Sequence, residues 1–251
     1  MRTPFICGNW KMYKTVSEAM AFLDAAKGLV GGVNDVDIGI GAPATALKSL
    51  ADGAKGSNIM IGGENCHWEN EGAFTGEISP QMLVEAGCKF VIIGHSERRR
   101  YFGETNETVN KKVKAALAAG LVVIMCCGET LAEREAGKTD AVVADHVKNG
   151  IAGLSMDEMA KVVIAYEPVW AIGTGKTATP EQAQDVHAVI RKLLAGMFGD
   201  AVAQTTRIQY GGSVKPENVR EIMAKPDVDG ALVGGASLKP DSFAKLVNFK
   251  A

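Results

Sequence analysis

The amino-acid sequence predicts a single-domain α/β protein, folded as a parallel (β/α)₈ barrel over residues 1–251. Three observations support this fold class. Short apolar runs recur about eight times, helical patterns fill the gaps between them, and no Pro/Ser-rich linker divides the chain. The length of 251 residues is typical of one eightfold barrel. Alternating strands and helices indicate a parallel sheet, but periodicity alone leaves a doubly wound open sheet as the structural alternative.

The expected strands are the short apolar runs. Several, such as Val91–Ile93 and Val162–Ala165, are continuously apolar. Such runs are typical of strands that are covered on both faces, as in parallel sheets. The predicted strands, in chain order, are Phe5–Gly8, Val36–Gly41, Ile59–Gly62, Phe90–Gly94, Leu121–Cys127, Val162–Tyr166, Thr206–Tyr210 and Gly230–Val233.

The helices between the strands are predicted from caps and apolar stripes. Thr179, Pro180 and Gln182 stand in the order of an N-cap, a first-turn proline and a capping-box residue. Ser79 followed by Pro80 predicts another helix start. The apolar stripe expected after Thr179 is Ala183, Val186, Ile190, Leu193 and Met197. A second stripe is Val109, Val113 and Leu117, and its helix should end at Gly120.

Composition and charge argue against several classes of partner. The formal net charge is −2, so no basic surplus indicates nucleic acid, although a local field can still attract a small anion. No run reaches the roughly 18 apolar residues of a membrane span, so no membrane association is expected. The N-terminus lacks the pattern of a signal peptide, and we expect a cytoplasmic protein.

The cysteines and most of the histidines are expected to be structural. The cysteines are odd in number, and their spacing matches no zinc site, so we expect free thiols in a reducing compartment. They are Cys7, Cys66, Cys88, Cys126 and Cys127. Nothing near His67 completes a metal site, and His146 and His187 lie in helical segments. We expect no metal ion.

Two glycine patterns resemble nucleotide-binding motifs without fulfilling them. Residues Gly39–Ala44 fit the loose dinucleotide pattern, and Glu64 lies near the expected position further on. The glycines fall within a predicted strand, which favours close packing instead. Residues 175–177 resemble the end of a P-loop, but Trp170 occupies the position of its first glycine. No nucleotide cofactor is therefore predicted.

The first and fourth predicted strands end in polar residues, at the edge where barrel enzymes place their active sites. Asn9 and Lys11 follow the first strand, and alternation would put them on one face. Lys11 would attract an anion there, unless it is an ordinary surface lysine. His95 follows the fourth strand, with Glu97 close by. It can polarise a carbonyl or move protons, and a structural core histidine is an equal alternative.

The sixth predicted strand ends in a glutamate followed by a lid-like segment. Glu167 precedes Pro168, which restricts its backbone to extended geometry. A carboxylate under apolar cover becomes more basic through desolvation. Val169, Trp170 and Ile172 would supply the cover, ahead of a Gly-Thr-Gly run at 173–175. The alternative is a connecting loop whose glutamate pairs with a lysine.

The last two predicted strands end in glycine pairs, at 211–212 and 234–235. The loops after strands seven and eight often form the phosphate site of a barrel. Glycines let backbone N–H groups approach a phosphate, and a short helix after Gly235 would add its positive end. Two ordinary tight turns are the alternative.

Six stretches together resemble the signature regions of the triosephosphate isomerase family. They span almost the whole chain in the family's order. The stretches are GNWKM (8–12), GAFTGEIS (72–79), IIGHSERR (92–99), AYEPVWAIGTGKTA (165–178), YGGSVKPEN (210–218) and LVGGASL (232–238). The resemblance implies a TIM barrel that interconverts dihydroxyacetone phosphate and glyceraldehyde 3-phosphate through an enediolate, without metal or organic cofactor.

The resemblance also implies roles for individual catalytic residues. Glu167 would be the base that removes a proton next to the substrate carbonyl. His95 would stay neutral, polarise that carbonyl and move protons between the two oxygens. Lys11 and Asn9 would give electrostatic and hydrogen-bonding help, and Glu97 would orient the cluster and pair with Lys11.

The remaining implied roles concern phosphate, the lid and the assembly. Ile172 and Leu232 would cover the base. In a homodimer, the loop at 72–79, with Thr75 near its tip, would enter the partner near Asn9 and Lys11. The backbone N–H groups expected to hold the phosphate are those of Gly173, Ser213, Gly234 and Gly235.

Two other functions compete with this interpretation. A Schiff-base aldolase on the same fold would need a lysine inside the barrel, whereas Lys11 stands near the mouth. A barrel used only for binding predicts damage at Glu167, His95 or Lys11, and all three residue types are intact.

Overall fold

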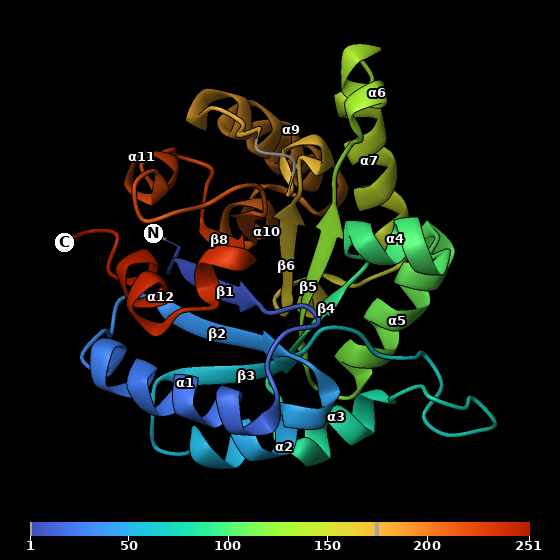
Figure 1. Cartoon of the computed structure of the whole chain (residues 1–251). Helices are drawn as coiled ribbons and strands as arrows, with labels where there is room; N and C mark the ends of the chain where they lie inside the picture. The colour runs from blue at the N-terminus through green and yellow to red at the C-terminus, as the bar shows by residue number, and fades with distance from the viewer. Residues whose placement is uncertain (1, 174–175) are drawn as a thin grey trace.

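The eight strands of the computed structural model, which describes residues 2–173 and 176–251, close into one parallel barrel. Neighbours in sequence pair in order, and β8 pairs with β1 (Figure 1). This closure confirms the (β/α)₈ class and excludes the open sheet. The strands are β1 Phe5–Asn9, β2 Asp37–Ala42, β3 Ile59–Gly63, β4 Phe90–Ile93, β5 Val122–Cys127, β6 Val162–Tyr166, β7 Arg207–Tyr210 and β8 Gly230–Val233.

Helices fill the connections and cover the outside of the barrel (Figure 1). The α-helices are α1 Val16–Val30, α2 Ala44–Gly53, α3 Pro80–Ala86, α4 Ser96–Phe102, α5 Asn106–Ala118, α6 Leu131–Glu135, α7 Thr139–Gly150, α8 Met156–Met159, α9 Pro180–Phe198, α10 Asp200–Thr205, α11 Val219–Met223 and α12 Pro240–Val247. Two 3₁₀ turns, η1 Val169–Ala171 and η2 Gly235–Ser237, follow β6 and β8.

Helix starts follow the capping residues in the sequence. The Thr179 side chain accepts the N–H of Gln182, and the Gln182 side chain accepts the N–H of Thr179, so the predicted capping box of α9 is confirmed. Ser79 caps α3 in the same manner, by accepting the N–H of Met82. Helix α5 ends just before Gly120, whose φ of 92° is the left-handed conformation expected there.

The predicted buried face of α9 was partly wrong. Leu194 is buried where the prediction chose Leu193, and Met197 in the last turn is 36% exposed. Two polar residues, His187 and Arg191, also lie on the buried face. Arg191 is satisfied there because it donates to the Ala203 carbonyl and pairs with Asp229. The apolar stripe did not predict this face fully, because polar side chains can also be buried when they have hydrogen-bond or ion-pair partners.

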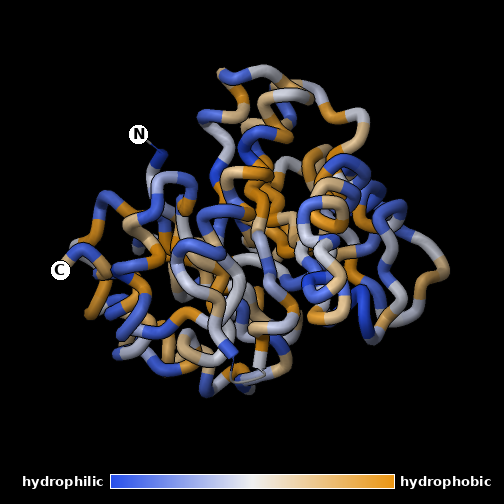
Figure 2. Tube along the Cα trace, turned by 90° about the horizontal axis from the view of Figure 1, so that it is seen from above, coloured by the Kyte–Doolittle hydropathy of each residue, from blue (hydrophilic) through white to orange (hydrophobic). Residues whose placement is uncertain are grey.

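Two hydrophobic clusters stabilise the barrel. The larger one fills the space between strands and helices, and the smaller one fills the barrel interior. Alternation along β5 places Cys126 in the interior cluster and Cys127 in the outer one. All five cysteines are buried free thiols, as expected. Figure 2 shows hydrophobic stretches gathered in the middle of the molecule and mixed colours along the outer helices.

The glycines of the dinucleotide-like pattern are packing residues. A Cβ on Gly39 would lie 2.8 Å from the Phe5 ring, and one on Gly41 would lie 2.8 Å from Ile92. Both glycines belong to β2, so the alternative of a closely packed strand is confirmed. Gly175 of the P-loop-like pattern lies outside the described residues, and so does Thr174 of the predicted Gly-Thr-Gly run at 173–175. No helix of the described part is long and apolar enough to cross a membrane.

Candidate active site

The strands bring most of the predicted site residues to one cavity at their C-terminal edge. The cavity has a volume of about 250 Å³. Its walls come from the ends of β1, β4, β6, β7 and β8. The predicted residues that line it are Asn9, Lys11, His95, Glu167, Ile172, Gly173, Ser213, Leu232, Gly234 and Gly235. Glu97 lines an adjoining pocket. It forms an ion pair with Lys11, which lines both the pocket and the cavity.

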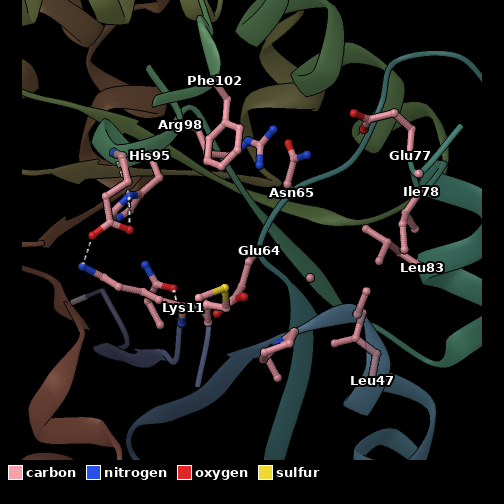
Figure 3. A pocket seen from close by; sticks show the side chains of 18 residues that line it. Lys11, Leu47, Glu64, Asn65, Glu77, Ile78, Leu83, His95, Arg98 and Phe102 are labelled. Atoms are coloured by element: carbon pink, nitrogen blue, oxygen red, sulfur yellow. Dashed lines mark hydrogen bonds and ion pairs between the residues drawn. The ribbon is translucent and has the colours of Figure 1, made fainter. Parts of the chain in front are cut away.

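Lys11 reaches the cavity by a backbone turn. Strand β1 ends at Asn9, and Lys11 has a φ of 56°, so the alternation argued from sequence does not extend to it. The Asn9 side-chain oxygen accepts the Lys11 N–H at 3.2 Å, which stabilises the turn. The Lys11 ammonium pairs with Glu97 at 2.6 Å (Figure 3). A lysine pinned in this way presents a fixed positive charge at the cavity.

Glu167 and His95 form a buried pair. Glu167 Oε1 lies 2.7 Å from His95 Nε2, and Glu167 Oε2 accepts the N–H of Ser96 at 3.0 Å. Burial acts to raise the pKa of Glu167, but the His95 ring and the Ser96 N–H outweigh it, so the pKa lies below its ordinary value. The basicity expected from desolvation is therefore absent while these two contacts are made.

The His95 ring is oriented from both of its nitrogens. Its Nδ1 atom accepts the N–H of Glu97 at 3.2 Å, at the start of α4. An acceptor at Nδ1 assigns the ring proton to Nε2, which donates to Glu167. Burial favours the uncharged ring, while the Glu167 carboxylate raises the pKa of His95 above its ordinary value. His95 therefore donates its Nε2–H to the Glu167 carboxylate across one short contact.

The two glycine pairs have different surroundings. A Cβ on Gly211 would lie 2.9 Å from Glu167, and one on Gly212 would lie 2.2 Å from the Tyr210 hydroxyl, so this pair permits close packing after β7. A Cβ on Gly234 would meet Lys11 at 3.6 Å, and Gly235 has open space around it. The predicted short helix after Gly235 is the turn η2. The second pair therefore leaves room beside a positive charge.

The comparisons with known proteins agree with this arrangement. The family described as triosephosphate isomerase matches residues 4–250. A triosephosphate isomerase from Geobacter metallireducens is 61% identical over 251 residues, covering 100% of both chains. Those from Trichlorobacter lovleyi and Carboxydothermus hydrogenoformans are 54% and 57% identical, covering 100% and 98% of each chain.

This chain belongs to the triosephosphate isomerase family. The resemblance drawn from six stretches of sequence is thereby confirmed, and so is the enzyme class of isomerase.

Sequence reasoning missed a buried glutamate that supports the lid-like segment of this family member. Glu129 follows β5 and is fully buried. It accepts hydrogen bonds from the Tyr166 hydroxyl at 3.1 Å and from the Trp170 indole N–H at 2.8 Å. Its backbone carbonyl accepts the N–H of Val169. Arg134 pairs with the carboxylate and lies over the Trp170 ring. Glu129 thus anchors the segment that directly follows Glu167.

A second missed residue, Glu64, lies in the adjoining pocket near Lys11 and His95 (Figure 3). Burial raises the pKa of its carboxyl to about 8, and the Glu97 carboxylate adds to this. Its Oε1 atom has no hydrogen-bond partner within the described chain. The sequence offers one signal, the position of Glu64 directly after β3. In the sequence alone, however, Glu64 stands out only as part of a nucleotide-like motif.

The histidines and cysteines do not assemble a metal site in the described ranges, 2–173 and 176–251. No group of three or more His, Cys, Asp or Glu side chains is placed to hold a metal ion there. His187 is fully buried, and its Nδ1 lies 3.0 Å from the Asp227 carbonyl. His67 stacks on Trp68 and packs against Phe74.

Proposed function

We propose that this cavity interconverts dihydroxyacetone phosphate and glyceraldehyde 3-phosphate by proton transfer, with Glu167 as the base and His95 as the electrophile. The reaction follows from membership of the family. The observation that supports these roles is the pair itself: a buried carboxylate and an imidazole N–H lie in a cavity that is also lined by a lysine and two open glycines.

Glu167 can become a strong base by leaving its present contacts. The His95 ring and the Ser96 N–H hold its pKa down, and both contacts are lost when the carboxylate advances to the substrate carbon. Burial then remains, and burial raises the pKa of a carboxyl. The same movement frees the His95 N–H for the substrate. One displacement thus prepares both catalytic groups.

His95 is suited to stabilise the enediolate. The Nε2–H donates to the substrate carbonyl oxygen, where negative charge develops as the proton leaves carbon. Because Nδ1 is occupied by the Glu97 N–H, the ring presents one donor at a fixed position. Proton transfer between the two substrate oxygens then completes the isomerisation. Proton abstraction next to a carbonyl requires a base and an electrophile, and we propose no metal and no organic cofactor.

The other predicted residues bind and orient the substrate. Lys11, held by Glu97, attracts the dianionic phosphate and the developing charge, and Asn9 donates to the substrate beside it. Ile172 and Leu232 cover Glu167 and exclude water, which protects an intermediate that would otherwise lose phosphate. The backbone N–H groups that we propose for the phosphate are those of Gly173, Ser213, Gly234 and Gly235.

An isotope experiment tests proton transfer directly. Glyceraldehyde 3-phosphate is converted in D₂O, and the product is examined by NMR. Transfer through a carboxyl that exchanges with solvent predicts deuterium on the product carbon that receives the proton. A Glu167→Gln variant that introduces deuterium as fast as the native chain would contradict the role of Glu167.

We further propose a cytoplasmic homodimer. The loop between β3 and α3 reaches out from the barrel (Figure 1), and Phe74 next to Thr75 is exposed. Met12 is 94% exposed and Phe102 67% exposed, and both line the pocket beside Lys11. Exposed apolar side chains that rim a pocket are typical of an interaction site. Entry of Thr75 into the partner's pocket, near Asn9 and Lys11, would cover them.

A further inference from the structure

A second cavity lies next to Glu167, between the ends of β4, β5 and β6 and helix α7. It has a volume of about 300 Å³. Of the described residues, Glu167 is the one that lines both this cavity and the substrate cavity. Glu167 is therefore shared by the linings of the two spaces. The mechanism above assigns no task to the second one.

The cavity is lined by the Arg99 guanidinium, which has one N–H group without a partner in the described chain. The Arg99 guanidinium donates to the Gly94 carbonyl at 2.9 Å and to the Asn106 side-chain oxygen at 2.7 Å. Both partners are uncharged. Its Nη2 atom has no hydrogen-bond partner within the described residues, although the Glu133 and Glu167 carboxylates belong to the same lining. A largely buried charge of this kind is stabilised by an anion nearby.

A second hydrogen-bond donor lines the same space. His146 Nδ1 accepts the N–H of Gly128 at 3.3 Å, which assigns the ring proton to Nε2. Burial, helped by Arg99, lowers the pKa of His146 to about 4, so the ring stays neutral at physiological pH. Arg100, which is exposed, adds a further positive charge at the cavity.

The carboxylates at the cavity are already engaged. Glu133 accepts from the Thr130 N–H and hydroxyl, each at 2.8 Å. Glu167 is held by His95 and Ser96. The lining therefore has two carboxylates and two arginines, and Arg99 Nη2 is a buried donor left without a partner in the described chain. The side chains of Cys127 and Val169 add apolar wall.

We propose that this cavity binds a small aliphatic carboxylate, whose charge lies beside Arg99 and Arg100 and whose hydrocarbon part lies against Cys127 and Val169. A polyanion such as a nucleotide is a poorer fit because Glu133 and Glu167 also line the space. One negative charge fits beside the unpartnered Arg99 Nη2, and an apolar tail fits against Cys127 and Val169.

A ligand in this cavity lowers the turnover of the enzyme. This part of the inference rests on the proposed function. The hydrocarbon part of the ligand contacts Val169 where it now stands, and this contact is lost when the segment around Glu167 moves. A ligand that prefers one arrangement shifts the population toward it. The carboxylate ligand therefore favours Glu167 in contact with Ser96 and slows its advance to the substrate. Because the phosphate site remains free, turnover falls while the KM for glyceraldehyde 3-phosphate stays unchanged.

Binding is tested by calorimetry with propionate as the probe, against chloride at the same ionic strength. Titrations are made with and without saturating glycerol 3-phosphate, which fills the substrate cavity but has no carbonyl to react. We expect saturable binding in both cases. Loss of propionate binding when glycerol 3-phosphate is present would place propionate in the substrate cavity and overturn the proposal.

Three variants locate the site. Arg99→Lys keeps the positive charge but moves it away from the cavity. Arg100→Gln removes an exposed charge at the cavity and leaves the buried groups unchanged. Arg220→Gln is the matched control, since it removes one exposed arginine on α11. We expect at least threefold weaker propionate binding in Arg100→Gln and unchanged binding in Arg220→Gln. Equal affinities in these two variants would overturn the proposal even if Arg99→Lys fails to fold.

Turnover is then measured with and without propionate. We expect kcat to fall several-fold at saturation, with KM unchanged. An active enzyme that binds no propionate contradicts this inference alone. A folded enzyme that is inactive before propionate is added contradicts the proposed function instead.

Discussion

The Glu64 carboxyl illustrates how burial changes the chemistry of a single residue. Its folded pKa, about 8, is well above its ordinary value of 4.5. Between these two values the folded state binds more protons than the unfolded state, so the stability of the fold decreases as the pH rises from about 5 to 8.

Glu64→Gln should remove this pH dependence. The amide keeps the shape of the side chain and carries no charge, so the variant should exceed the native chain by on the order of a few kcal/mol at pH 8 and by little at pH 5. Urea unfolding across this pH range measures the difference. Glu217→Gln, at an exposed glutamate, serves as the control. Parallel stability curves for Glu64→Gln and the native chain would refute a raised pKa of Glu64 in the folded state.

Single residues also mark the limit of prediction from sequence. Glu167 and His95 stand out in the sequence because each directly follows an apolar run predicted to be a strand, and the structure brings the two side chains together. Glu129 and Glu64 also follow strands, but their importance depends on contacts with Tyr166, Trp170 and Lys11, which come from other strands and loops. No spacing within one segment reveals such contacts.

At the scale of elements, the strand ends are packed so closely that glycine is required. An ideal Cβ on Gly128, just after β5, would lie 1.7 Å from the Glu167 carbonyl oxygen. Since Glu167 donates its own N–H to the Cys127 carbonyl, the two strand ends are held together at this point. The position of Glu167, the proposed base, therefore depends on a glycine just after the neighbouring strand.

Gly128→Ala should cost on the order of 3 kcal/mol or more of stability, because backbone must shift to accept the methyl group, and should lower kcat by moving Glu167. Gly196→Ala is the control, because nothing lies within 4 Å of its Cβ position in α9. It should raise stability by up to about 1 kcal/mol. Thermal unfolding and turnover of both variants check this. A fully active, stable Gly128→Ala would show that the strand ends are not in tight contact.

The elements themselves were largely predictable. Every strand lies within one residue of its predicted bounds, because strands buried on both faces leave continuous apolar runs. The face of α9 was less predictable, since Leu193 and Leu194 are neighbours and periodicity did not select between them. Arg191 is buried because it has partners, Ala203 and Asp229. Both lie outside α9, so the pattern within the helix does not reveal them.

At the scale of the whole molecule, the closed barrel explains how residues far apart in sequence form one site. Closure through the β8–β1 pairing brings Gly234 next to Lys11. The fold class and the family resemblance together predict that Gly234 and Lys11 belong to one site. The sequence did not predict the second cavity beside Glu167, because that space arises from how α7 and the ends of β4 to β6 pack.

Assembly is the second property at this scale. Removing most of the loop at 72–79, including Thr75, should give a monomer with most of its turnover lost, because the partner would no longer cover the pocket beside Asn9 and Lys11. Light scattering reports the mass, and circular dichroism checks that the barrel persists. A folded monomer with full activity would contradict the proposed dimer contact.

The most direct measurement of the account as a whole is turnover of glyceraldehyde 3-phosphate by the native chain and by Glu167→Asp. The substitution keeps the charge but withdraws the carboxylate by one methylene, so proton abstraction slows while phosphate binding survives. We predict fast native turnover and a kcat lowered by on the order of 100-fold or more, with KM changed little. Equal turnover of the two proteins would contradict the assignment of Glu167 as the base.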